Sequence, residues 1–180
     1  MVGVRTLDIA RRDADMAVRF ARPTASGLVC RKLGEVGFSL YASRDYLAKR
    51  EAPKRGAGLA GYDIITFTRA PAAISPFFMG ESLDDARIAS RCDNPLIQLQ
   101  AAARDVGIAE LACCLGDERA ELTRIWPDES PVLRTVWLVV HQDLQRSARV
   151  RAVTAAIADA FLRHGKFLRD GSRASRHSAR

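Results

Sequence analysis

A capped helix between two strand-like segments in the middle of the chain limits the fold class most. Asn94 can cap a helix with Pro95 at its first position, where the missing N–H of proline costs nothing. The helix has an apolar face at spacings of 3, 4 and 3, formed by Leu96, Leu99, Ala103 and Val106. The flanking segments 87–92 and 107–112 are typical of strands. Strands that alternate with helices indicate an α/β domain.

The rest of the chain continues this alternation. Further strands are predicted over 16–20, 28–42, 62–68 and 132–141. Within 28–42 we expect two strand segments with a bend, because Gly34 and Gly37 interrupt the pattern. Ser43 and Ser147 are in position to cap helices that begin at the next residue. The last helix has an apolar stripe formed by Val150, Val153, Ile157 and Phe161.

The basic charge is concentrated at the end of the chain. The formal net charge of the 180 residues is +7, and residues 163–180 contribute six cations and one anion, which leaves +2 for the rest. We therefore predict one domain over residues 1–165 and a basic, disordered tail over 166–180. The alternative for the tail is salt-sensitive, sequence-independent binding of nucleic acid.

The sequence argues against a metal centre, a membrane segment and catalysis. The four cysteines form no C-x-x-C pair, so we expect no metal and no cofactor. No apolar run is long enough to span a membrane and no secretory signal is visible, which predicts a cytoplasmic protein. Cys113 or Cys114 as nucleophile with His141 as base is conceivable, but nothing in the sequence brings them together. We predict that the chain is not an enzyme.

Four blocks of sequence resemble one known family. They are residues 13–46, with Asp13-Ala-Asp-Met-Ala-Val-Arg-Phe and Ala-Ser-Arg-Asp-Tyr46, residues 94–117, residues 133–144, with Trp137-Leu-Val-Val-His141, and residues 146–153. In this order they are similar to the effector (substrate)-binding domain of LysR-type transcriptional regulators, over about residues 5–165. The resemblance implies a two-lobed, periplasmic-binding-protein-like (type II) α/β fold, in which residues 13–46 cross between the lobes. The family's winged helix-turn-helix and the strand–helix–strand that opens the first lobe have no counterpart here, so we expect a truncated domain with an incomplete first lobe.

The resemblance also implies a function. It predicts transcriptional regulation, with this chain as the small-molecule effector-sensing domain of a LysR-type regulator without its own DNA-binding domain. In the family such domains form homo-oligomers and reach DNA through the helix-turn-helix that is absent here. The alternative is a non-functional remnant or an internal-start fragment. Two residues depart from the family pattern, Asp105 in place of glycine and Ala112 in place of proline.

The resemblance places the effector between the lobes. On the first-lobe side it implies Arg19, Phe20 and Arg22, since a guanidinium can hold the carboxylate of an organic acid through two hydrogen bonds. The alternatives are that either arginine pairs with Asp13 or Asp15 and that Phe20 only packs the lobe.

On the far side, Asn94 at a helix N-terminus could present N–H groups to an anion, or could only cap its helix. Phe67 and Thr68 end a strand expected to point toward the same cleft; a core Phe and a surface Thr are the alternatives.

Overall fold

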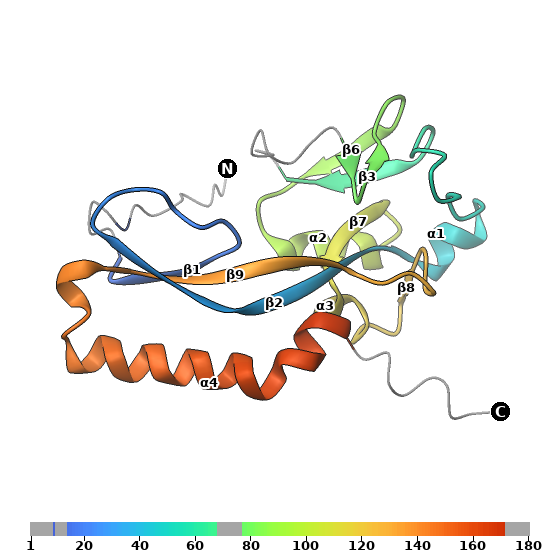
Figure 1. Cartoon of the computed structure of the whole chain (residues 1–180). Coiled ribbons are helices and arrows are strands. Elements are labelled where there is room, and N and C mark those ends of the chain that lie inside the picture. Colours follow the sequence, from blue (N-terminus) through green and yellow to red (C-terminus); the bar gives the residue numbers. More distant parts are fainter. Residues whose placement is uncertain (1–8, 10–13, 68–76, 172–180) are drawn as a thin grey trace.

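One sheet extends through both halves of the molecule in the computed structural model, which describes residues 9, 14–67 and 77–171 (Figure 1). Its strands are β1 (Met16–Arg19), β2 (Leu28–Ser43), β3 (Asp63–Thr66), β6 (Arg87–Arg91), β7 (Ile108–Ala112), β8 (Leu122–Arg124) and β9 (Val132–His141). The order is β1-β9-β2-β7-β3-β6, and β8 pairs with the end of β2. The short strands β4 (Phe77–Phe78) and β5 (Glu81–Ser82) form a separate hairpin. The helical elements are α1 (Arg44–Ala48), α2 (Pro95–Ala103), α3 (Cys113–Gly116), the 3-10 turn η1 (Gln142–Leu144) and α4 (Ala148–Asp170).

The long antiparallel pair of β2 and β9 connects two lobes (Figure 1). We call β1, the start of β2, the end of β9 and the helix α4 the first lobe. The second lobe contains β3 to β8 and α1 to α3, with β6, β3 and β7 parallel to one another. This two-lobed α/β architecture confirms the predicted fold class.

Each lobe has its own core. In the first lobe Leu138, Val140 and Val150 pack between the sheet and α4. In the second lobe successive residues of β3 and β7 face opposite sides of the sheet, so Ile64 and Ile65 belong to different clusters. The helix α2 covers one side through Leu99 and Ala102.

Two predicted helix caps are confirmed at atomic detail. The backbone N–H of Leu96 donates to Oδ1 of Asn94 at 2.9 Å, and that of Tyr46 donates to Oγ of Ser43 at 2.9 Å. Ser147 occupies the cap position of α4 but makes no side-chain hydrogen bond there. Local capping chemistry therefore located the start of each of these helices.

Some sequence predictions were wrong. Residues 28–43 form one strand with a bulge between Lys32 and Gly34, not two segments. Leu96 and Val153, assigned to apolar core-facing stripes, are 58% and 47% exposed. Residues 166–170, assigned to the tail, belong to α4.

Gly37 serves close packing rather than a bend. A Cβ atom at this position would lie 1.9 Å from the backbone oxygen of Arg169, near the end of α4. The glycine therefore lets the end of α4 approach β2 closely.

Candidate functional site

The predicted first-lobe residues lie where the chain leaves β1. Arg19 is the last residue of the strand and pairs in register with Trp137 of β9. The guanidinium of Arg22 lies over the Trp137 ring, 5.2 Å from its centre, a cation–π contact. The ring of Phe20 meets that of Phe38 edge to face at 5.3 Å, yet its residue is 52% exposed. Phe20 thus packs the lobe and still presents half of its surface. Of the proposed ion-pair partners, Asp13 lies outside the described residues.

The predicted second-lobe residues follow two neighbouring parallel strands. Phe67 follows β3 and Asn94 follows β6, and the backbone N–H of Cys92 donates to the carbonyl oxygen of Thr66 at 2.9 Å. The structure therefore brings Phe67 and Asn94 to the same edge of the sheet. Oδ1 of Asn94 is engaged in the cap, as the simpler alternative predicted. Thr68 lies outside the described residues.

A chain of contacts that the sequence did not reveal connects the two lobes. Phe20 touches Phe38, the guanidinium of Arg134 lies 4.4 Å from the centre of the Phe38 ring, and Arg134 forms an ion pair with Glu110. Arg134 comes from β9 and Glu110 from β7, so the pair reaches across β2, which lies between them in the sheet. We call these four residues the interlobe chain.

The acidic end of the interlobe chain is buried. The residue Glu110 is 8% exposed, and its burial raises the pKa of the carboxyl above its usual value, although the ion pair with Arg134 and a hydrogen bond from the backbone N–H of Met79 counteract this. The ion pair therefore joins a buried carboxylate to a guanidinium whose side chain is 31% exposed. A single charged residue inside the apolar run Ile108–Ala112 was the one sequence signal for it.

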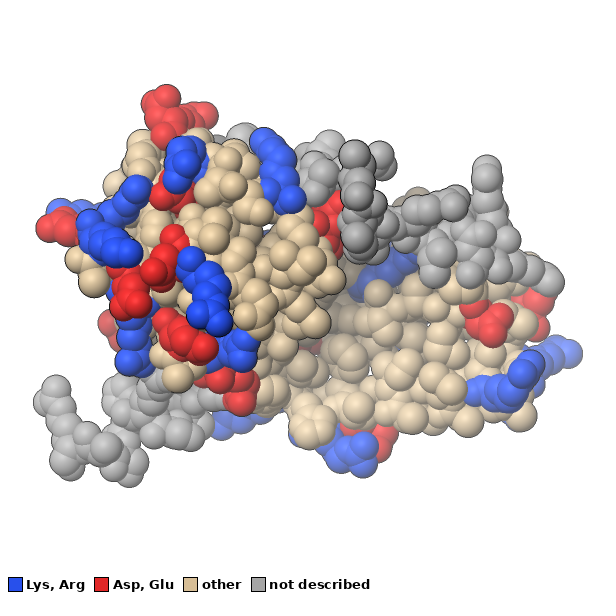
Figure 2. All heavy atoms as spheres, turned by 180° about the vertical axis from the view of Figure 1, so that it is seen from behind, with Lys and Arg blue, Asp and Glu red and all other residues tan. Residues whose placement is uncertain are grey.

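Figure 2 shows the molecule from behind the view of Figure 1, and the surface is hollowed between the two lobes. The second lobe carries intermingled basic and acidic side chains, whereas the adjoining surface of the first lobe is largely uncharged.

The described residues offer little for catalysis or metal binding. They contain no group of three or more His, Cys, Asp or Glu side chains that could hold a metal ion. Burial raises the pKa of both the Cys113 and the Cys114 thiols, which disfavours the reactive thiolate. His141 lies at the far end of β9, where its Nδ1 accepts the backbone N–H of Asp143 at 3.3 Å. Among the helices of the described residues, none is long and apolar enough to cross a membrane.

Two lobes joined by crossing strands, with a hollow between them, define the class of periplasmic-binding-protein-like (type II) ligand-binding domains. The sequence model of the LysR substrate binding domain matches residues 3–162. The chain therefore belongs to the LysR substrate binding domain family, whose role is effector sensing in transcription regulation. Family and structural neighbours are regulators rather than enzymes.

Solved structures show the same fold. The regulatory domain of CrgA, a LysR-type transcriptional regulator from Neisseria meningitidis, has a TM-score of 0.73 and 21% identity over 88% of this chain and 80% of that one. The effector domain of AmpR from Pseudomonas aeruginosa has a TM-score of 0.67 and 20% identity, covering 89% of this chain and 78% of that one. Full-length LysG from Corynebacterium glutamicum with bound effector Arg has a TM-score of 0.63 and 15% identity, covering 86% of this chain and 53% of that one. This chain thus spans about half of that full-length regulator. No curated protein sequence matches the chain.

Proposed function

We propose that the hollow between the lobes binds a small organic acid as the effector of a transcriptional regulator. The interlobe chain carries this proposal, because its four residues connect the two lobes through side chains that a ligand could rearrange. A ligand that binds one relative placement of the lobes better than another shifts the equilibrium toward it. LysG from Corynebacterium glutamicum, which shares the fold, has been solved with its effector Arg bound.

In this proposal the two lobes supply different contacts. Arg22 is exposed and Arg19, three residues earlier, is half-buried, so either guanidinium can bind the carboxylate. Phe20 supplies an exposed ring face on the same side. Phe67, Thr68 and Asn94 are proposed to contact the ligand from the second lobe.

The proposal also covers the cellular setting. A domain that senses effectors for transcription acts in the cytoplasm, where the DNA of the relatives' bacterial hosts lies. There we propose that it works as a homo-oligomer. Contact with DNA is then made by a helix-turn-helix domain and not by this domain.

A ligand screen tests the effector site. A panel of small aliphatic and aromatic carboxylates is screened by thermal shift, and each ligand that raises the melting temperature is titrated by calorimetry. We expect Arg22→Gln to weaken binding of the selected acid about tenfold, as for the loss of one charge-assisted hydrogen bond. Arg149→Gln, which removes the same charge from an exposed position in the first turn of α4, is the control and should bind like the wild type. If no acid binds, or if Arg22→Gln binds as tightly as the control, the proposed site is wrong.

A further inference from the structure

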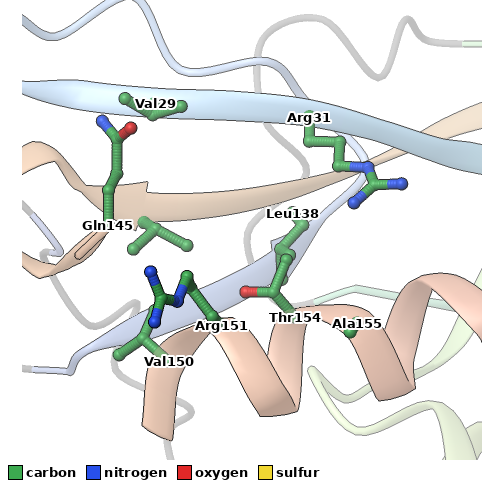
Figure 3. A pocket seen from close by; sticks show the side chains of 9 residues that line it. Val29, Arg31, Leu138, Gln145, Val150, Arg151, Thr154 and Ala155 are labelled. Carbon is green, nitrogen blue, oxygen red and sulfur yellow. The ribbon is translucent and has the colours of Figure 1, made fainter. Parts of the chain in front are cut away.

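A second cavity lies away from the interlobe hollow, between α4 and the sheet of the first lobe (Figure 3). Its volume is about 320 Å³, which is at the lower end of the range for small-molecule sites. Val29, Leu138 and Val140 line it from the sheet, and Val150 and Ala155 line it from the helix. The buried floor is therefore apolar.

The cavity lies on the opposite side of the sheet from the Arg22–Trp137 contact, and none of its nine lining residues belongs to the interlobe chain. Leu138 faces α4, and side chains alternate along a strand, so the neighbouring Trp137 with its Arg22 contact faces the other way. A ligand in this cavity would not touch the aromatic and charged contacts of the interlobe hollow. The two sites are physically separate.

Two arginines stand at the walls of the cavity without counter-charges. In Figure 3 Arg31 extends from β2 and Arg151 from α4, with Leu138 between them. Neither guanidinium takes part in an ion pair or a side-chain hydrogen bond with any residue that the structure describes. None of the nine lining residues is acidic, whereas four arginines of the second lobe have carboxylate partners: Arg50, Arg55, Arg87 and Arg124.

The start of α4 adds to this positive character. The first turn contains no acidic residue, and Ser147 makes no side-chain cap hydrogen bond. The positive end of the helix dipole is thus uncompensated within one turn of Val150 and Arg151, which line the cavity. The cavity combines an apolar floor with a positive rim.

From this combination we infer a second ligand site, which takes a small carboxylate with an apolar body of one ring or a short acyl chain. The apolar body fills the space over Leu138 and Val150, and the carboxylate lies at the rim, which the guanidiniums of Arg31 and Arg151 make positive from opposite ends. Gln145 and Thr154 are further polar groups at the wall that can orient the acid. Because the site lies between α4 and the β2–β9 pair, its ligand would bias how this helix packs against the crossing strands. The inference does not depend on the interlobe site.

Calorimetry on the full 180-residue chain tests the site, with 3-phenylpropionate as the probe and the neutral 3-phenylpropan-1-ol as its comparison. We expect the acid to bind at millimolar concentration or below and the alcohol to bind at least about tenfold more weakly. Arg31→Gln and Arg151→Gln should each weaken binding of the acid about tenfold, and binding should weaken as salt is added. Ala155→Trp, which fills the cavity and keeps both arginines, should abolish it.

Matched variants separate this site from the interlobe hollow. Arg149→Gln carries the same charge change on the same helix turn but does not line the cavity, and Arg22→Gln alters the other site. Both should bind the probe like the wild type. The inference is overturned if the wild type does not bind the probe, if the alcohol binds as tightly as the acid, if Arg31→Gln and Arg151→Gln bind normally, or if Arg22→Gln alone abolishes binding. Circular dichroism of each variant confirms that it is folded.

Discussion

Replacement of Arg124 by methionine should destabilise the domain strongly, because this arginine connects the end of α4 to the second lobe. Its side chain is 5% exposed. Nη2 donates to the backbone oxygen of Asp170 in α4 at 2.7 Å, and Nε donates to the Tyr41 hydroxyl at 2.9 Å. Nε and Nη2 also hold both carboxylate oxygens of Asp117, at 2.9 and 2.5 Å. The network therefore joins α4, β2 and the loop after α3.

The expected loss in the free energy of unfolding depends on which groups Arg124→Met leaves without a partner. Removal of one partner of a buried ion pair costs about 3–5 kcal/mol, because the other charge remains without compensation. Asp117 would keep the hydrogen bond from Tyr41 at 2.8 Å. In the wild type Nη1 of Arg124 is buried without a hydrogen-bond partner among the described residues, and its removal returns about 1 kcal/mol. The net loss in the free energy of unfolding should be about 2–4 kcal/mol, which for a chain of this size lowers the melting temperature by about 4–16 °C.

Urea denaturation followed by circular dichroism measures the loss, and calorimetry gives the melting temperature. The control is Arg163→Met, which breaks the exposed Asp159–Arg163 pair on the same helix and should cost less than about 0.5 kcal/mol. The double variant Asp117→Leu/Arg124→Met removes both charges and should be more stable than Arg124→Met alone. If Arg124→Met costs no more than Arg163→Met, or if the double variant is the least stable, the network does not hold the helix as argued.

Three further predictions concern single residues. Gly37→Ala should lower the free energy of unfolding by about 2–3 kcal/mol in urea denaturation, because its Cβ would overlap the backbone of α4. Gly165→Ala, with open space around it, is the control and should be neutral or stabilising. Equal effects of the two variants would contradict the packing argument. Asp105 has a φ of 62° and accepts a hydrogen bond from the Ser43 hydroxyl. Both Asp105→Gly and Asp105→Ala lose this hydrogen bond, but only glycine adopts the positive φ without strain. Asp105→Gly should therefore be about 1 kcal/mol more stable than Asp105→Ala in urea denaturation, and the reverse order would contradict this. Burial would raise the pKa of Glu81, but hydrogen bonds from two backbone N–H groups and an arginine lower it below its usual 4.5. The stabilisation by the Glu81 carboxylate is therefore present above that pH and is lost as the pH falls through the lowered pKa. In urea melts the stability difference between wild type and Glu81→Gln should shrink from pH 6 to pH 3, and a constant difference would refute this.

The candidate site contains residues that the sequence indicated and residues that only the structure identified. Arg22, Phe20 and Asn94 could be named because the family resemblance located the crossing between the lobes. Arg134 and Glu110 could not, although they form the ion pair that joins the lobes. They become neighbours only because β9 and β7 both pair with β2 in a particular register, and long-range register is not encoded by nearby residues.

The exposure of two predicted apolar helix positions also depends on contacts with residues far away in the chain. The spacing that predicted apolar faces for α2 and α4 was real. However, Leu96 in the first turn of α2 and Val153 in the second turn of α4 are about half exposed. Periodicity indicates which residues share a face; only the neighbouring element decides how much of that face is covered.

By itself the sequence determined the longer elements, two of the helix caps and the family, because a cap hydrogen bond or a strand alternation spans only a few residues. Asn94 with Leu96 and Ser43 with Tyr46 are cases in which the deciding contact is local. The tertiary structure alone decided that β2 continues through Gly37 to meet the end of α4, that Arg134 pairs with Glu110 across β2, and that Arg31 and Arg151 face one cavity. Each of these depends on residues far apart in the chain, whose meeting is set by strand register and helix packing.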